Sequence, residues 1–347
     1  MKNLAFLFLF FLAINVSGQS KKDTVSIIGV GDIMMGSNYP DNMGLPPSNG
    51  QFLLKNVKDI LSNADVTFGN LEGVLLDEGG TPKTCRDPKV CYVFRSPVSF
   101  AQNLVDAGFD LMSLANNHAG DFGDVGRKSS MKTLEEVGLY YAGQTQKPFV
   151  TFVKDSIRYG FVAFAPNSNC IDINDLEGAK AIVNHLDSIS DIVIISFHGG
   201  AEGAQYQHVP RTEELFHGEN RGDVYKFAHT LIDAGADIIF GHGPHVTRAV
   251  EVYKDRFIAY SMGNFCTYGG INVAGVNGLA PIIKVYTSNT GTFYKAQITA
   301  THQTNRAPVM IDPQNQVIRR IQELAKQDFP ENPVTIADDG VVKYSTR

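Results

Sequence analysis

The residues in this sequence best suited to chemistry are histidines, carboxylates and amides that follow short apolar runs. His242 and His245 come directly after the apolar run 238–240, with a glycine and a proline between them. Imidazole is the commonest metal ligand in proteins, and it is also a general acid or base near neutral pH. The sequence therefore predicts a metal or acid–base site at this loop.

Four further apolar runs lead into residues of the same kind. They end at Asp32, at Asn70 and Glu72, at Asn116, Asn117 and His118, and at His198. Alone, most of these residues would be turn or cap residues, so the prediction depends on all of them meeting at one place. Carboxylate, amide and imidazole ligands together suit a borderline divalent ion such as zinc, manganese or iron. Two such ions about 4 Å apart would polarise a phosphoryl group and generate a hydroxide nucleophile.

Buried β-strands are the elements predicted to bring these loops together. Apolar runs of this length are typical of such strands. They lie at 25–31, 65–69, 110–114, 191–197 and 237–241, and each of the last four opens with an aspartate. The spacing of apolar residues over 224–232 predicts an amphipathic helix before the last strand. In open α/β sheets ligands bind at the carboxyl ends of the strands, so the sequence predicts an α/β fold with the site at that edge.

At these loops the sequence resembles the bacterial capsule synthesis proteins of the poly-γ-glutamate type, the CapA family. The matching motifs lie, in order, at 31–34, 69–72, 94–97, 113–118, 197–202, 241–246 and 260–265. That family is similar to the calcineurin-like metallophosphoesterases. The resemblance therefore implies a four-layer α/β/β/α sandwich.

The resemblance also implies a role for each matching residue. Metal ligation falls to Asp32, Glu72, Asn117, His198, His242 and His245. His118 matches the acid catalyst of the Asn-His motif. Arg95 is expected to hold an anionic group, because its guanidinium pairs with carboxylate or phosphate at two points. The implied cofactor is one or two divalent ions of manganese, zinc or iron.

The sequence departs from the metallophosphoesterase pattern at three points. Met34 stands where the first motif has a second ligand, and His242 and His245 are three residues apart instead of two. The bridging aspartate of the second motif is missing, with Asn70 and Glu72 as its replacements. Glu72 is the better replacement, because an anionic oxygen bridges two cations while a neutral amide does so poorly. One metal position is thus short of a ligand.

Two functions follow from these motifs. The first is an exported metal-dependent hydrolase of capsule or poly-γ-glutamate metabolism, acting on a phosphoester or an anionic polymer. The second is a non-catalytic polymer-binding subunit of a capsule assembly at the membrane. His118 favours the enzyme, since a purely structural ion needs no acid beside it. The formal net charge of −6 and the lack of a basic run argue against nucleic acid as a partner.

The first 18 residues predict export, because a positive charge, an apolar core and small residues follow one another as in a signal peptide. Cleavage would leave Gln19 first, in a periplasmic, cell-surface or secreted protein. Residues 19–347 are expected to form a single domain, with a plain C-terminal extension after about 300 and a lid-like loop at 204–222.

The four cysteines allow disulfide bonds in an exported protein. Cys85 and Cys91 flank a short polar loop, so a bond between them is predicted. Cys170 and Cys266 could pair with each other or remain buried thiols.

Overall fold

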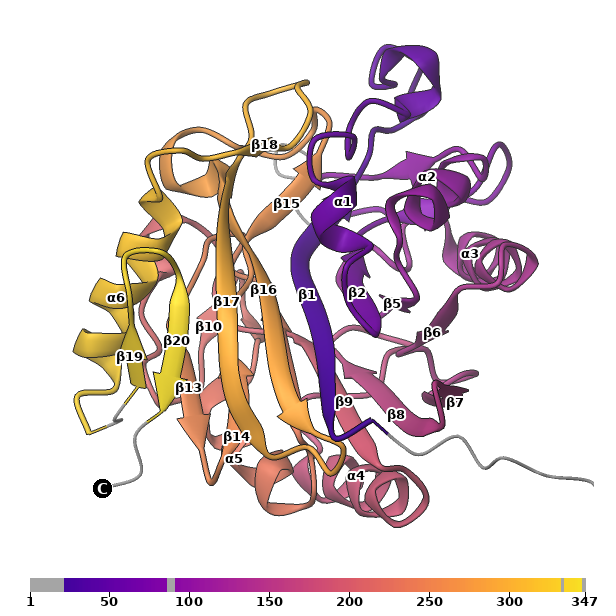
Figure 1. The fold of residues 1–347 in the computed structure, drawn as a ribbon. Helices are drawn as coiled ribbons and strands as arrows, with labels where there is room; N and C mark the ends of the chain where they lie inside the picture. The colour runs from indigo at the N-terminus through magenta and orange to yellow at the C-terminus, as the bar shows by residue number, and fades with distance from the viewer. Residues whose placement is uncertain (1–21, 86–90, 332–333, 345–347) are drawn as a thin grey trace, which may run out of the picture.

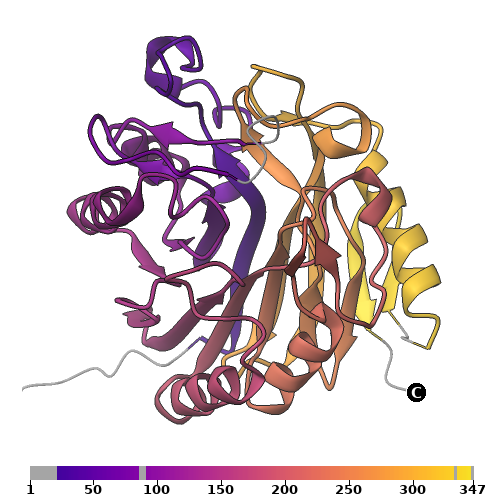
Figure 2. The same cartoon turned by 180° about the vertical axis from the view of Figure 1, so that it is seen from behind.

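The computed structural model describes residues 22–85, 91–331 and 334–344. The signal peptide predicted for residues 1–18 lies outside the described residues. Two large sheets face each other in the described chain, with helices on the outer side of each (Figures 1 and 2).

The larger sheet contains the first three strands of the predicted set. Its main path runs β19-β20-β17-β16-β1-β2-β5-β6, while β15 pairs with β1 and β18 with β17. The strands are β1 (Thr24–Met34), β2 (Val66–Leu71), β5 (Leu111–Ser113), β6 (Tyr140–Ala142), β15 (Asn264–Thr267), β16 (Leu279–Ser288), β17 (Phe293–His302), β18 (Met310–Ile311), β19 (Val334–Ile336) and β20 (Val341–Tyr344). The four neighbouring strands β1, β2, β5 and β6 run parallel, so the loops that follow them lie at the same edge of the sheet.

The second sheet carries the histidine loops. Its order is β13-β14-β12-β9-β8-β7, with a parallel centre and an antiparallel strand at each edge. The strands are β7 (Phe149–Lys154), β8 (Ile157–Phe164), β9 (Ile192–His198), β12 (Ile238–His242), β13 (Val250–Tyr253) and β14 (Arg256–Ala259). His198 and His242 are register partners at the ends of β9 and β12.

Three hydrophobic clusters define the four layers. The helices are α1 (Lys58–Leu61), α2 (Phe100–Ala107), α3 (Gly123–Glu136), α4 (Leu176–Ile189), α5 (Val224–Asp233) and α6 (Gln316–Asp328). Ile27 packs between the sheets, while its neighbour Ile28 faces α1 and α2. Ile194 likewise faces the other sheet and Ile195 faces α4 and α5. Both faces of these strands are buried, which explains their unbroken apolar sequence. The predicted four-layer α/β/β/α architecture is confirmed.

Each aspartate that opens a strand ties that strand to its parallel neighbour. Asp65 Oδ2 accepts from the Ser26 N–H at 2.8 Å, and Asp110 Oδ2 accepts from the Thr67 N–H at 2.9 Å. Asp191 and Asp237 repeat this contact in the second sheet. The aspartates therefore start the strands in register, at the edge opposite the proposed site.

One glycine is required where β1 meets β15. The Asp32 N–H donates to the Gly263 carbonyl at 2.8 Å. A Cβ atom at Gly31 would lie 2.0 Å from that same carbonyl oxygen. Only glycine allows this close approach, which places Asp32 beside its register partner Asn264.

The remaining described segments lie around the two sheets. The loop 204–222 contains a 3-10 helix at Ala204–Tyr206 and the short strands β10 (Leu215–Phe216) and β11 (Glu219–Asn220). Short strands β3 (Val74–Leu75) and β4 (Arg95–Ser96) pair beside α3, and further 3-10 turns lie at Pro47–Gly50 and Gly275–Gly278. After residue 300, β18, β19 and β20 extend the larger sheet and α6 packs against it. No helix in the described part of the chain is long and apolar enough to span a membrane.

Candidate metal centre

Asp32 and the two histidines after β12 form the innermost part of the site. Asp32 Oδ1 lies 3.1 Å from His242 Nδ1, and Asp32 Oδ2 lies 2.9 Å from His245 Nδ1. Asn70 Nδ2 also donates to Asp32 Oδ1 at 2.8 Å. Asp32 and His242 are fully buried. The sequence prediction that β1, β2 and β12 end at one place is therefore confirmed.

Three residues from three different loops offer ligand atoms to one point. Among the described residues, Glu72, His198 and His245 each have a ligand atom within 4.8 Å of the others'. His245 Nε2 lies 3.5 Å from Glu72 Oε1. The spacing suits a single divalent ion held by one carboxylate and two imidazoles.

The buried polar atoms that lack partners support the same position for an ion. Both carboxylate oxygens of Glu72, both ring nitrogens of His198 and Nε2 of His242 are buried without a hydrogen bond. Buried polar atoms normally have a partner, and each one left without costs about 1–3 kcal/mol. All of these atoms are of the type that coordinates metal, so the residues present fit a divalent cation.

Backbone strain at His245 is consistent with a functional position. His245 has a φ of 57°, in the left-handed region that favours glycine. Asn264 Nδ2 donates to the His245 carbonyl at 3.0 Å and to two carbonyls of the following loop. The neighbouring strand thus holds His245 in a conformation that a free loop would leave.

The charges around the centre favour a cation. Burial alone would raise the pKa of Asp32, but His242 and His245 outweigh it and lower that pKa below its usual range. Burial raises the pKa of Glu72 to about 8. Burial alone would lower the pKa of His245, but the carboxylates of Glu72 and Asp32 raise it to about 10. Two carboxylates thus hold a proton on His245, and a metal ion would supply the same positive charge. His198 is different, because burial lowers its pKa well below the usual value and keeps its ring neutral.

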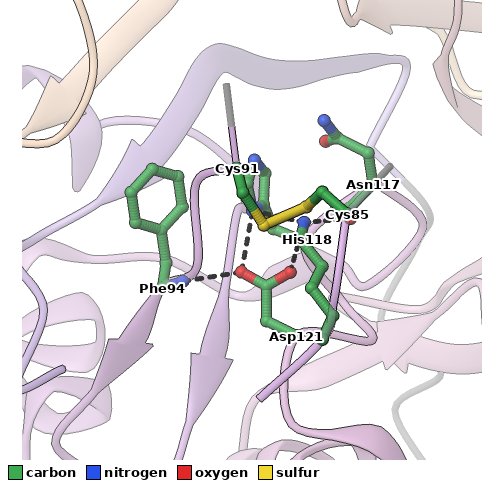
Figure 3. Close-up of a disulfide and its surroundings, with 7 residues drawn as sticks. Cys85, Cys91, Phe94, Asn117, His118 and Asp121 are labelled. Atoms are coloured by element: carbon green, nitrogen blue, oxygen red, sulfur yellow. Dashed lines mark hydrogen bonds and ion pairs between the residues drawn. A yellow bond between two sulfur atoms is a disulfide. The ribbon is translucent and has the colours of Figure 1, made fainter. Parts of the chain in front are cut away.

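His118 belongs to a second group, next to the first, which includes a carboxylate that the sequence analysis missed. His118 Nδ1 lies 2.8 Å from Asp121 Oδ2, and Asp121 Oδ1 pairs with Lys83 Nζ at 2.6 Å (Figure 3). Burial lowers the pKa of His118, while Asp121 works against that shift. Because Asp121 occupies Nδ1, the free ring nitrogen of His118 is Nε2. The sequence feature that could have identified Asp121 is its position three residues after His118.

Asn117 and Arg95 differ in whether their side chains already have partners within the protein. The Asn117 Oδ1 atom is buried without a hydrogen-bond partner, as expected of a ligand atom. The Arg95 guanidinium donates to Asn38 Oδ1 at 2.5 Å and stacks over Phe122 at 4.9 Å. These contacts fix Arg95 within the β4 region, and its role in holding an anion stays a prediction.

The loop 204–222 and the turn before it contribute charges that the sequence analysis did not assign. Arg221 is buried and pairs with Glu202 and Glu219, each at 3.0 Å. Glu202 is near enough to raise the pKa of His245. Arg248, fully buried, makes a two-point pair with Glu214 at 2.7 Å for each contact. These pairs anchor the loop next to the centre, and Arg221–Glu202 and Arg248–Glu214 join residues far apart in sequence.

Comparison with known proteins identifies the family. Residues 26–268 match the profile of the family described as "Bacterial capsule synthesis protein PGA_cap". The chain belongs to this capsule synthesis family. The match begins in β1 and ends just after β15, so it includes every strand that carries a residue of the candidate centre. The family resemblance inferred from the sequence is confirmed.

Relatives within the capsule synthesis family are moderately similar. The capsule biosynthesis protein CapA of Bacillus anthracis is 29% identical over 264 residues, which cover 71% of this chain and 60% of that protein. The PGA biosynthesis protein CapA of Bacillus subtilis is 27% identical, covering 70% and 63%. The chain thus matches about 60% of the length of these relatives.

A solved structure shares the fold. The crystal structure of a hypothetical protein from Thermus thermophilus is similar with a TM-score of 0.50 at 15% identity, covering 80% of this chain and all of that one. A putative 5'-nucleotidase from Staphylococcus aureus has a TM-score of 0.45 at 16% identity, covering 88% and 58%.

Proposed function

We propose that the protein is an exported, metal-dependent hydrolase of capsule or poly-γ-glutamate metabolism. One observation carries the proposal. Glu72, His198 and His245 bring ligand atoms within 4.8 Å of one another, next to a histidine that is held by a buried carboxylate. A structural ion alone would explain the first group and leave the second without a purpose. The substrate class we favour is a phosphoester or an anionic polymer.

The residues of the centre have two roles, because some would bind the ion and others orient the side chains that bind it. Glu72, His198 and His245 would hold the ion, with His242 and Asn117 offering further unpartnered atoms. Asp32 holds both His242 and His245 from one side, which fixes the orientation of their rings. A bound divalent ion would polarise a phosphoryl or carbonyl oxygen and make water a stronger nucleophile at neutral pH.

His118 would act as the general acid. Its Nδ1 atom is bonded to Asp121, so Nε2 is the atom that can give a proton to a leaving oxygen. Such help typically accelerates a reaction by about 10²–10⁴-fold. The Phe94 ring packs against the His118 ring at 4.4 Å, which limits its rotation and the access of water.

The test combines metal analysis with a substrate screen. The mature protein is purified, its metal content is measured, and phosphoesters and γ-glutamyl polymers are offered as substrates. We expect bound zinc, manganese or iron, and turnover that a chelator abolishes and that returns when the ion is restored. Bound metal without turnover on any substrate would favour the polymer-binding subunit, and absence of metal would contradict the metal-dependent hydrolase.

Export is part of the proposal. The first 18 residues have the charge and apolar order of a signal peptide, so the mature chain would start near Gln19. A disulfide between Cys85 and Cys91 supports an oxidising compartment, where such bonds persist. Mass spectrometry of the protein from a cell fraction outside the cytoplasm tests this, and an intact Met1 there would contradict cleavage.

A further inference from the structure

We propose that the Cys85–Cys91 disulfide and Lys83 form a clamp that positions His118 through Asp121. The clamp consists of Lys83, the disulfide and Phe94. It rests on the proposed function, since His118 is the acid of that reaction. The positioning itself is a property of the fold and can be measured without turnover. Lys83 and Phe94 are positioning residues here, because both act through Asp121 and His118.

The disulfide connects two chain segments that reach the same carboxylate. Cys85 and Cys91 are 5.5 Å apart at Cα and six residues apart in sequence. The segments 81–85 and 91–94 belong to no helix or strand. Lys83 precedes the disulfide by two residues, and Phe94 follows it by three. The covalent bond therefore limits how far the two segments can move apart.

The segment before the disulfide binds Asp121 twice. The Lys83 N–H donates to the Asp121 carbonyl at 2.7 Å, and Lys83 Nζ pairs with Asp121 Oδ1 at 2.6 Å. Lys83 Nζ also donates to the Asn117 carbonyl at 3.2 Å and lies 3.3 Å from His118 Nδ1. One lysine thus contacts the loop on both sides of His118.

The segment after the disulfide contacts Asp121 and His118 through Phe94. The Phe94 N–H donates to Asp121 Oδ2 at 2.6 Å, the same oxygen that contacts His118. The Phe94 ring packs against the His118 ring, with ring centroids 4.4 Å apart, and Figure 3 shows both residues beside the disulfide. Asp121 is fully buried, so these donors supply the hydrogen bonds and charge that water cannot.

Together these contacts fix one orientation of the His118 ring. With Asp121 Oδ2 held by Phe94 and Oδ1 held by Lys83, the carboxylate has one remaining role, which is to accept from His118 Nδ1. In the neutral ring this places the proton on Nδ1, and Nε2 is then the nitrogen that can exchange a proton with a substrate. Loss of the clamp would allow Asp121 and His118 to rotate and the tautomer to vary.

The first test observes the His118 ring by NMR. Protein labelled with ¹⁵N-histidine is compared as wild type, Lys83→Met and the double variant Cys85→Ser/Cys91→Ser, with His118→Gln to assign the signal. We expect a single Nδ1–H tautomer in the wild type and an averaged signal in both variants. Lys83→Arg should restore the wild-type signal. Identical His118 signals in wild type and variants would overturn the proposal.

A matched control separates this effect from general loss of a lysine ion pair. Lys154 pairs with Asp110 at 2.5 Å, as closely as Lys83 pairs with Asp121, but at the start of a strand away from His118. Lys154→Met should leave the His118 signal unchanged. A change of equal size in Lys154→Met would mean that the signal reports overall destabilisation, and the clamp would be rejected.

Turnover provides the second test. We expect Lys83→Met and the double serine variant to lower kcat about tenfold, part of the gain that a general acid supplies. KM and metal content should change by less than about twofold, because no metal-binding side chain is removed. A wild type without turnover would contradict the proposed function, while the NMR comparison would still decide the clamp. Unchanged kcat in an active enzyme would contradict the clamp alone.

Discussion

Asp32 and Glu72 are both fully buried carboxylates, but their oxygens are used differently. Asp32 contacts two imidazoles and an amide, whereas both oxygens of Glu72 lack a hydrogen bond. Burial raises the pKa of Glu72 to about 8, so the charge of this carboxylate is the one that a cation would stabilise most. This difference is the physical reason to place Glu72 in direct contact with the ion.

Replacement of the ligands should remove the metal. We expect Glu72→Gln, His198→Ala and His242→Ala each to weaken metal binding by at least about tenfold. Elemental analysis of the purified variants measures this. His208→Ala is the control, because His208 is half exposed and pairs with Asp328 away from the centre. Equal metal content in the wild type and all three variants would contradict the proposed metal site.

His118→Ala should separate catalysis from metal binding. His118 contacts Asp121 and none of Glu72, His198 and His245, so the variant should retain its ion. Turnover should fall by about 10²–10⁴-fold, the usual contribution of a general acid. Metal content and kcat are measured on the same preparation. If both fall in proportion, His118 supports the metal and the acid role is wrong.

The elements that position the site were predictable because their signals are local. The five apolar runs became β1, β2, β5, β9 and β12, each within a few residues of its predicted bounds. A parallel strand buried on both faces needs such a run, and its carboxyl end needs a loop. The Cys85–Cys91 bond was predictable for the same reason, because the two cysteines are only six residues apart in sequence.

Contacts across long sequence separations were not predictable. Arg248 and Glu214 are 34 residues apart, and no pattern in either segment indicates that they meet. Cys170 and Cys266 are both buried free thiols, which the sequence left open. The pairing of such residues depends on how the two sheets pack, and a single sequence holds no local signal for that.

Glu214→Gln should destabilise the loop 204–222 and the strand that follows the histidine loop. It leaves the Arg248 guanidinium buried without its charge partner, which typically costs about 3–5 kcal/mol. Urea unfolding measures the loss. Replacing both residues by apolar ones, Glu214→Leu with Arg248→Met, should recover much of the stability. Asp233→Asn, which breaks an exposed pair with Lys254, serves as the control and should have little effect. Equal effects of Glu214→Gln and Asp233→Asn would contradict this account.

At the scale of the molecule, the centre joins the two halves of the sandwich. Asp32, Asn70 and Glu72 come from the larger sheet or its loops, while His198, His242 and His245 come from the second sheet. Ligand atoms from both sheets therefore meet at one edge. An ion bound there would link the sheets and stabilise the native state by mass action, by about 2.7 kcal/mol at a concentration of 100 Kd.

Metal should also reverse the dependence of stability on pH. In the metal-free protein, Glu72 and Asp32 raise the pKa of His245 to about 10, whereas an unfolded histidine titrates near 6.5. Between these values the native state holds a proton that the unfolded state has lost. The resulting stability is complete below pH 6.5 and is lost as the pH rises toward 10, by at most about 1.4 kcal/mol per pH unit.

With metal bound, His245 must be neutral to act as a ligand, so that proton is displaced. The unfolded histidines then take up protons below about pH 6.5 that the native state cannot, and stability rises with pH up to that point. Urea unfolding from pH 5 to 9 therefore gives a stability that falls above about pH 6.5 with chelator, and one that rises up to about pH 6.5 and then levels off with added ion. His245→Gln should reduce the decline of the metal-free protein, leaving the part due to Glu72, whose pKa burial raises to about 8, while the control His208→Ala should keep the whole decline. Parallel curves with and without metal would mean that the ion and the proton on His245 do not compete for one position, and that Glu72, His198 and His245 do not hold the ion together.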